Sequence, residues 1–126
     1  MFKNTKAFSG FSVNDQAAAK KFYGETLGIE VEDGPMGLKL NIAGGNPVFV
    51  YPKDDHAPAT YTILNFPVDN IDKAVEELAG QGIKLEHYEG MTDKKGIARG
   101  ISAHRGPDIA WFKDPAGNTL SVLQEG

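Results

Sequence analysis

The sequence of 126 residues lacks cysteine altogether and has no long apolar run. Without cysteine the chain can form neither a disulfide bond nor a thiolate site for metals or catalysis. A membrane-spanning helix needs about 20 consecutive apolar residues, so we expect no membrane partner. The 13 lysines and arginines are scattered among 17 acidic residues. This pattern lacks the basic patch that nucleic-acid binding requires, so we expect no nucleic-acid partner either.

The amino-terminal residues 1–9 also lack the features of a secretion signal. They contain two lysines but neither an apolar core nor a small-residue cleavage site. We therefore expect a cytoplasmic protein. Hydrophobic residues make up 40% of the chain and charged residues 24%. At this length, that balance predicts a single globular domain spanning residues 1–126.

The chain contains an internal repeat. Residues 66–70 resemble residues 11–15 at a displacement of 55 positions, and each segment ends a strand-like run and precedes a helix-like one. Towards the end of each half, residues 118–123 resemble residues 46–51 at a displacement of 72 positions. Self-similarity of this kind indicates two copies of one structural unit.

Each copy has the pattern of one strand, one helix and three further strands. The first helix is expected at about residues 16–26, and a strand is expected after each helix, at residues 28–31 and 82–85. The second helix has a stripe of apolar residues at helical spacing: Ile71, Ala74, Val75, Leu78 and Ala79. The pattern predicts an α+β fold of two βαβββ modules, at about residues 5–54 and 59–125.

The second copy carries an insertion. The displacement between the copies grows from 54 positions at Gly82 to 72 at the last strand, so 18 residues are extra, and they fall in residues 90–106. Long loops in small domains are often functional, and mobile loops often gate clefts. We expect this loop to fold over the mouth of a ligand-binding cleft and to offer Arg99 or His104 to the ligand. The alternative is a solvated connection.

Strand alternation predicts which side chains face away from the helices. Two curved mixed sheets with helices on their outer faces leave the inner faces to line a shared cleft. Aromatic walls with a few polar groups are typical of small-molecule sites, and the alternative is that the aromatic residues merely fill the interior. The expected ligand-binding residues are Phe8, Phe49, Tyr51, Tyr61, Asn65, Arg99, His104, Trp111 and Ser121.

Three local motifs accompany the repeat. They are Val13-Asn-Asp15 leading to Phe22-Tyr23 and Leu27-Gly28, Val68 before the second helix, and Trp-Phe-Lys-Asp-Pro-Ala-Gly-Asn at residues 111–118. With the paired modules, they resemble the vicinal-oxygen-chelate (VOC) superfamily of glyoxalase I, bleomycin resistance proteins and extradiol dioxygenases. The resemblance covers about residues 6–124. It implies the glyoxalase/bleomycin resistance/dihydroxybiphenyl dioxygenase fold, and it implies a homodimer.

The resemblance also implies where a metal would bind. Enzymes of this superfamily usually hold a divalent metal through His, Glu or Gln, one from each first strand and one from each last strand. The matching positions are Phe8, Ile63, Phe49 (Tyr51 if the register slips by two) and Ser121. None is a usual ligand for such a metal, and a shift by one residue to Ser9, Thr62 or Val122 brings none. We therefore expect no metal and no cofactor.

Histidines are the remaining candidates for chemistry without a metal. His56 is expected to be a solvated residue between the modules. On a strand, either His87 with Glu89 or Glu86 with Tyr88 would face the cleft, and the first pair could serve as acid and base. The catalytic candidates are therefore His87, Glu89 and His104.

These observations favour a metal-independent protein of the VOC type that binds a small molecule in an aromatic cleft. An enzyme of the same fold that uses general acid–base chemistry, as a lyase or isomerase, is the first alternative. A metal-dependent glyoxalase-like lyase or dioxygenase is the second, and it needs ligands that the sequence does not offer. Whether the chain catalyses any reaction stays open.

Overall fold

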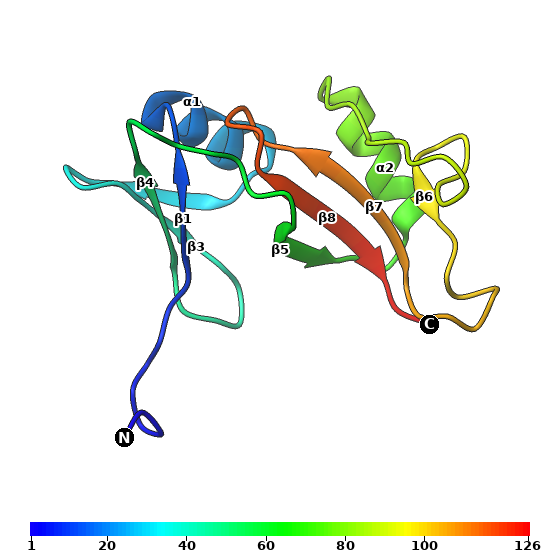
Figure 1. Cartoon of the computed structure of the whole chain (residues 1–126), viewed down its shortest axis with the longest axis horizontal. Helices are drawn as coiled ribbons and strands as arrows, with labels where there is room; N and C mark the ends of the chain where they lie inside the picture. The colour runs from blue at the N-terminus through cyan, green and yellow to red at the C-terminus, as the bar shows by residue number, and fades with distance from the viewer. The chain divides into compact units, whose positions relative to one another are not determined.

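Each half of the chain folds into a four-stranded mixed sheet with a helical segment across one face (Figure 1). The structure, a computed structural model, describes residues 1–126 and consists of two units, Met1–Pro58 and Ala59–Gly126. The first unit contains β1 (Gly10–Val13), α1 (Gln16–Lys20), η1 (Lys21–Thr26), β2 (Glu30–Asp33), β3 (Leu38–Asn41) and β4 (Val48–Pro52). The second unit contains β5 (Thr62–Pro67), α2 (Ile71–Gly80), β6 (Ile97–Ala98), β7 (Asp108–Lys113) and β8 (Thr119–Gln124).

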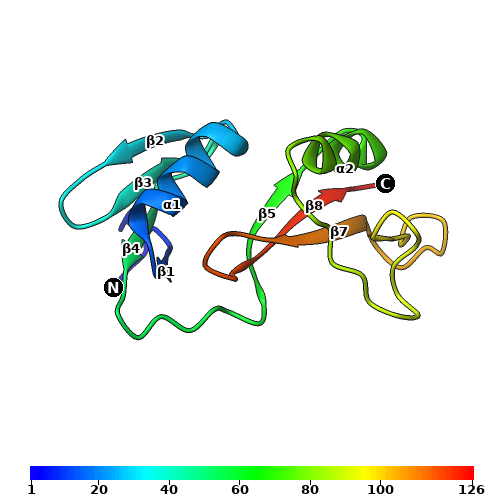
Figure 2. The same cartoon turned by 90° about the horizontal axis from the view of Figure 1, so that it is seen from above.

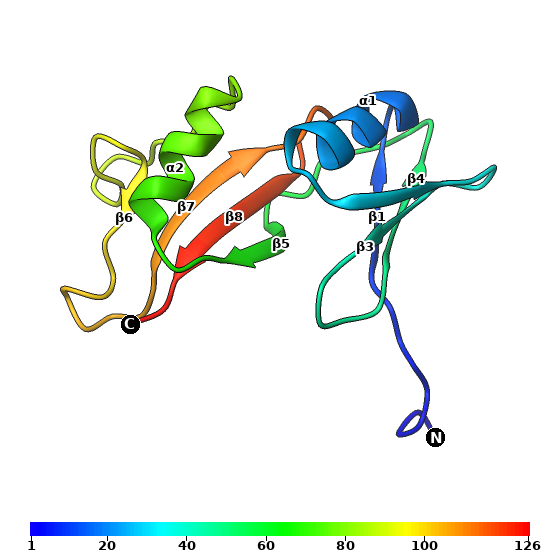
Figure 3. The ribbon, with the colours of Figure 1, turned by 180° about the vertical axis from the view of Figure 1, so that it is seen from behind.

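The two sheets have the same topology. Their strand orders are β1-β4-β3-β2 and β5-β8-β7-β6, with the first strand parallel to the last and the other pairs antiparallel. Figure 2 shows α1 over the first sheet, and Figure 3 shows α2 across β7 and β8. The α+β fold of two βαβββ modules is therefore confirmed.

The strand register reproduces the sequence repeat. Gly10 lies opposite Phe49 in the pairing of β1 with β4, and Asn65 lies opposite Ser121 in the pairing of β5 with β8. Asn65 follows Gly10 by 55 positions and Ser121 follows Phe49 by 72. These are the two displacements of the repeat, so equivalent residues occupy equivalent places in the two sheets.

The helices lie where the sequence predicts them. The first begins as α1 and continues as the π-helical η1, in which the N–H of Leu27 donates to the carbonyl of Phe22, five residues earlier, at 2.9 Å. At the start of α2, the side chain of Asn70 accepts a hydrogen bond from the N–H of Lys73 at 3.1 Å and caps the helix. The buried residues of the predicted stripe are Ile71, Val75 and Leu78.

The strand predicted at residues 82–85 is absent, and this prediction was wrong. Two separate segments share the outer edge of β7. The N–H of Glu86 donates to the carbonyl of Trp111 at 2.8 Å, whereas Ile97 of β6 lies opposite Ala110. In the first unit, β2 covers the corresponding edge of β3 without a break. The insertion therefore interrupts this edge strand after Glu86, and the pairing resumes at Ile97.

The first strand also starts later than predicted. β1 begins at Gly10, although the carbonyl of Ser9 already accepts a hydrogen bond from the N–H of Phe49 at 3.0 Å. Phe8 precedes this pairing and is 68% exposed. Its expected place on the strand is therefore corrected, because the sheet ends before reaching it.

The core of each unit lies between its sheet and its helix. Apolar side chains on that face are almost completely buried: Val13, Leu38, Leu40 and Val50 in the first unit, and Ile97, Ala110, Phe112, Leu120 and Val122 in the second. The opposite face of each sheet carries no helix, and we call it the open face of that unit. None of the helices is long and apolar enough to cross a membrane.

Candidate functional site

Two stacked aromatic rings dominate the open face of the first unit. Phe49 and Tyr51 are two residues apart on β4 and therefore point to the same side. Their ring centroids lie 5.7 Å apart at an interplanar angle of 19°. Both side chains are half-buried. We call this pair of parallel rings the aromatic platform, because it offers apolar surface against which a planar ligand can pack.

A polar pair adjoins this platform. Ser12 lies opposite Tyr51 on the neighbouring strand β1, so both side chains belong to the open face. The hydroxyl Oγ of Ser12 lies 2.7 Å from Nδ1 of His56, at hydrogen-bond distance, and which atom donates depends on the tautomer of the imidazole. The N–H of His56 donates to the carbonyl of Lys53 at 3.0 Å, so a turn after β4 brings the imidazole back over β1.

The sequence-based interpretation of His56 was wrong, and Ser12 was missed. His56 is half-buried and hydrogen-bonded rather than a solvated linker residue. Strand alternation places the hydroxyl of Ser12 on the open face, but serine is common on exposed strands. The partner lies 44 residues away, and no local pattern connects the two.

A shallow groove flanks the other edge of the aromatic platform. It has a volume of about 280 Å³ and runs between Phe49, Lys39 and the turn from β2 to β3. Met36 in this turn is 77% exposed. The ring of Phe49 packs against Gly37, where a Cβ would lie 3.0 Å from its Cζ. The groove extends the apolar platform beyond the stacked rings.

The open face of the second unit also carries aromatic rings. Trp111 of β7 and Tyr88 meet edge to face, with centroids 5.5 Å apart at 77°. The hydroxyl of Ser121 donates to Oδ1 of Asn65 at 2.6 Å. Ser121 is completely buried, whereas Asn65 is exposed. Of these two predicted ligand-binding residues, Asn65 is the one that presents polar atoms to solvent.

Of the two pairs of alternate residues after α2, His87 with Glu89 or Glu86 with Tyr88, only one lies on this open face. Glu86 lies 3.4 Å from Nζ of Lys113, a residue on the same face as Trp111, and Tyr88 touches Trp111 itself. The pair on the open face is therefore Glu86 and Tyr88. His87 lines a groove of about 490 Å³ beside α2, against Val75 and Ala79. The acid–base pair of His87 and Glu89 is not assembled on the open face.

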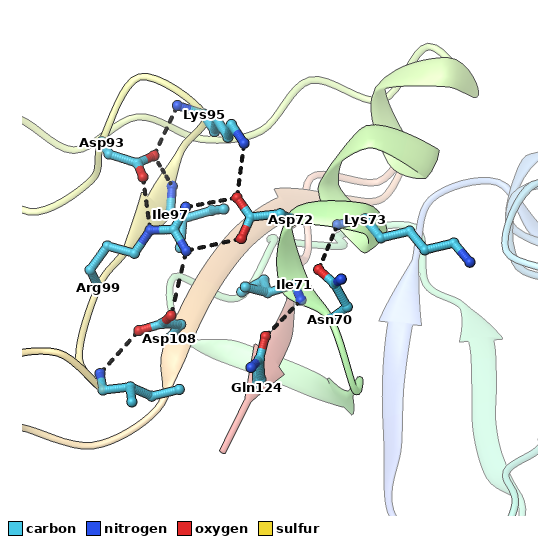
Figure 4. Close-up of polar contacts among 11 residues, drawn as sticks. Asn70, Ile71, Asp72, Lys73, Asp93, Lys95, Ile97, Arg99, Asp108 and Gln124 are labelled. Carbon is cyan, nitrogen blue, oxygen red and sulfur yellow. Dashed lines mark hydrogen bonds and ion pairs between the residues drawn. The ribbon is translucent and has the colours of Figure 1, made fainter. Parts of the chain in front are cut away.

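Arg99 lies at the amino-terminal end of α2, in a network of charged side chains (Figure 4). Its guanidinium contacts Asp72 at 2.8 Å, Asp93 at 3.0 Å and Asp108 at 3.5 Å. Lys95 contacts Asp72 as well, at 2.9 Å. Hydrogen bonds from Arg99 and Lys95 hold the pKa of Asp72 well below its ordinary range, and the hydrogen bond to Asp72 raises the pKa of Arg99.

This network fixes the position of the middle of the insertion. Asp72 belongs to α2, so Arg99 and Lys95 tie the middle of the insertion to the helix-covered side of the second sheet. The guanidinium of Arg99 is engaged by three carboxylates, and its expected contact with a ligand stays a prediction. His104 lies exposed in a turn that the N–H of Arg105 closes on the carbonyl of Gly100 at 2.9 Å, and it has a positive φ of 53°.

The sequence model of the Glyoxalase/Bleomycin resistance protein/Dioxygenase superfamily matches residues 8–122. The chain belongs to this superfamily. The matched range includes both βαβββ units and the motif at residues 111–118. No curated protein matches the sequence.

Solved structures of the glyoxalase superfamily share the fold. A glyoxalase family protein from Bacillus anthracis is 23% identical, with a TM-score of 0.69 and coverage of 100% of both chains. An antibiotic-binding protein from a Streptomyces species, TnmS3, is 23% identical, with a TM-score of 0.67 and coverage of 98% of each chain. A fosfomycin resistance protein from Listeria monocytogenes, FosX, is 15% identical over 94% of this chain and 90% of its own, with a TM-score of 0.67.

The metal positions of the superfamily do not suit a divalent ion in this chain. Phe49 and Ser121 lie on the open faces, and Ser121 already donates its hydroxyl proton to Asn65. Phe8 lies outside the sheet, and Ile63 is apolar. A transition metal or magnesium needs several nitrogen or oxygen donors, and these four side chains supply one hydroxyl between them.

Proposed function

We propose that this member of the glyoxalase superfamily binds a planar small molecule on its aromatic open faces, without a metal. The observation that carries the proposal is the stacked pair of Phe49 and Tyr51. Two parallel rings, half-exposed and flanked by a groove and a polar pair, form a surface suited to stacking against a flat ligand. Trp111 and Tyr88 supply a second aromatic surface. One structural relative is an antibiotic-binding protein, and this likeness supports a function in binding small molecules.

Metal independence rests on the residues at the four superfamily positions. A metal-dependent lyase or dioxygenase polarises substrate oxygens through a bound ion, and that ion needs a set of donor side chains. Phe49 and Ile63 offer no donor atom, and the hydroxyl of Ser121 is engaged by Asn65. The acid–base alternative has little support, because His87 and Glu89 do not gather on an open face.

Calorimetric titration of the whole chain with a panel of planar aromatic compounds, in the presence of a chelator, tests the proposal. Phe49→Ala and Tyr51→Ala should each weaken binding about three- to tenfold, the loss expected for one aromatic contact. Phe2→Ala is the matched control, since Phe2 is 76% exposed on the amino-terminal segment and belongs to neither open face. One equivalent of tightly bound metal by elemental analysis, with binding lost on its removal, would contradict metal independence.

We also propose that the protein forms a homodimer. Phe8 and Tyr61 are 68% and 72% exposed, and large apolar side chains of this kind are often covered by a partner chain. Light scattering at micromolar concentration should give twice the mass of the chain, and Tyr61→Asp should shift the protein towards the monomer. A monomer throughout that range would contradict the proposal. The cytoplasmic location stays a prediction.

A further inference from the structure

Each unit has a groove beside its helix, between the helix and the segment that follows it in the chain. In the second unit this groove has a volume of about 490 Å³ and lies between α2 and residues 83–87. In the first unit a groove of about 470 Å³ lies between the helical segments and Val31 of β2. The repeat makes the two grooves equivalent, because Ala79 follows Gly24 by 55 positions and Leu85 follows Val31 by 54.

The two grooves differ in their chemistry. In the first unit, Lys20 of α1 forms an ion pair with Asp33 of β2 at 3.3 Å, and this pair joins the helix to the edge strand. The equivalent residues of the second unit are Val75 and His87, which line the groove and form no such pair. The other apolar side chains of its lining belong to Ala79, Ile83 and Leu85. The second groove therefore offers apolar surface where charges bridge the first.

The insertion forms one side of the second groove. Gly96 is buried and has a positive φ of 88°, and a Cβ there would lie 2.9 Å from the Cβ of Leu85. Only glycine lets the insertion pack this closely. The neighbouring Lys95 lines the groove and contacts Asp72 of α2 at 2.9 Å (Figure 4). The segment that distinguishes the second unit from the first is therefore held in place as part of this groove.

The rim of the second groove carries one uncompensated positive charge. Lys84 lines the groove, is exposed and forms no ion pair or side-chain hydrogen bond. The first unit has Glu30 at the equivalent position, so the sign of the charge is reversed. Lys95 is balanced, because Asp72 and Glu76 both raise its pKa and Glu76 is the acidic residue of the lining. The charge left for a ligand is that of Lys84, which attracts an anion.

We propose that the groove between α2 and the insertion is a second binding site, and that its ligand is an amphipathic anion: a short alkyl chain ending in a carboxylate. The chain packs against the apolar lining, and the carboxylate lies at the rim beside Lys84. A saturated chain has no flat face with which to stack on the aromatic platform. The two sites therefore take ligands of different chemistry, and this inference does not depend on the function proposed for the open faces.

Calorimetric titration of the whole chain near neutral pH with two probes, octanoate and 1-octanol, tests the charge of the ligand. The quantity measured is the affinity for octanoate divided by that for 1-octanol, because this ratio cancels changes that affect the alkyl chain alone. Lys84→Ala should lower the ratio about two- to fivefold, the effect of one exposed charge pair. Lys84→Arg keeps the charge and should keep the ratio. Lys94→Ala, an exposed lysine of the insertion outside the groove, is the matched control.

A second variant tests the place of binding. Ala79 is exposed on α2 and lines the groove, so Ala79→Phe fills the groove without entering the core. It should lower the affinity for both probes about tenfold or more, because the new ring occupies the volume that the alkyl chain needs. Ala103→Phe, in the exposed turn of the insertion, is the matched control and should bind both probes like the parent protein.

Each contrary outcome overturns a stated part of the inference. If the parent protein shows no saturable binding of octanoate, there is no such site, whether or not planar aromatic compounds bind to the open faces. An unchanged ratio in Lys84→Ala overturns the choice of an anion. Parent affinity in Ala79→Phe shows that octanoate binds elsewhere and overturns the site. A change of mass in light scattering of Ala79→Phe shows that a second copy of the chain covers the groove, and this also overturns the site.

Discussion

Leu40 of β3 and Phe112 of β7 occupy equivalent places in the two sheets. Each lies opposite an apolar residue of the last strand in its sheet, and each faces the helix of its own unit. On the open face the equivalence ends. Lys39 of the first unit corresponds to Trp111 of the second, and Phe49 corresponds to Ser121. The side that forms the core keeps its apolar character in both halves, because burial demands it. The open side differs residue by residue, and there each unit can carry its own binding chemistry.

The connections on the outer edge of the two sheets differ as well. In the first unit, the turn from β2 to β3 is closed by the N–H of Gly34 on the carbonyl of Gly37 at 3.0 Å. A Cβ at Gly37 would lie 2.4 Å from the carbonyl oxygen of Val50, so only glycine fits. The second unit replaces this tight turn by the insertion, and an ion network ties the insertion to α2. A longer connection needed additional contacts to become ordered.

The largest effect is expected where the two units agree. Phe112→Ala should lower the free energy of unfolding by about 3–5 kcal/mol, and Leu40→Ala by about 2–5 kcal/mol, because each leaves a cavity in a fully packed core. Urea denaturation of the whole chain measures both. Lys39→Ala, next to Leu40 but on the open face, is the control and should cost less than about 0.5 kcal/mol. A Leu40→Ala variant as stable as the control would break the equivalence of the two cores.

A smaller effect is expected at the turns before the last strands, which differ between the units. Asp114 is 5% exposed, and its carboxylate accepts hydrogen bonds from the N–H groups of Ala116 at 3.0 Å and Asn118 at 2.8 Å. Asp114→Ala leaves those donors without this acceptor and should cost about 2–3 kcal/mol in thermal or urea unfolding. Asn46, the counterpart of Asn118, donates to the carbonyl of Ala7 on the exposed surface, so Asn46→Ala should cost about 1 kcal/mol or less. Equal losses of unfolding free energy in Asp114→Ala and Asn46→Ala would show that the two turns stabilise their units equally, contrary to this prediction.

The insertion should loosen when its ion network is removed. Arg99→Ala should lower the free energy of unfolding by about 1–2 kcal/mol, a modest value because the guanidinium is 35% exposed and its ion pairs are screened by solvent. Hydrogen exchange should speed up at the amides of Lys95 and Ile97, which donate to Asp93. Arg105→Ala, in the exposed turn of the same insertion, is the control. Unchanged exchange in Arg99→Ala would show that the network does not hold the insertion.

The smallest expected effect is a decrease in the stability of the protein at low pH. The pKa of Asp72 is lowered from its ordinary value of 3.8 by Arg99 and Lys95, so its stabilising contribution is complete above that value and is lost as the pH falls below it. The parent protein should therefore lose more stability between pH 6 and about pH 3 than Asp72→Asn does. Urea midpoints at the two pH values measure the difference, and Glu77→Gln on the exposed side of α2 is the control. If Asp72→Asn loses as much stability as the parent protein between these pH values, the low pKa of Asp72 does not contribute to stability as proposed.

Periodicity was enough to predict the elements that form the cores. The stripe that includes Ile71, Val75 and Leu78 predicted α2, and the repeat predicted two copies of one βαβββ unit. The edge strand after α2 was predicted wrongly, because apolar residues such as Ile83 and Leu85 resemble a strand even where the partner strand is shared with another segment. Which segment occupies that edge depends on where the insertion returns, and local sequence does not encode it.

The sequence by itself determined the α+β class, the two modules and the side chains that face each helix, since these depend on local propensity and on the spacing of apolar residues. Only the tertiary structure decided which polar groups meet. Ser12 and His56 are 44 residues apart, and Asp72 and Arg99 are 27 apart. Such pairs follow from the path of the turns and loops between them. A hydrogen bond needs its donor and acceptor about 3 Å apart, and an ion pair needs its charged atoms within about 4 Å. No periodicity places a loop residue that accurately.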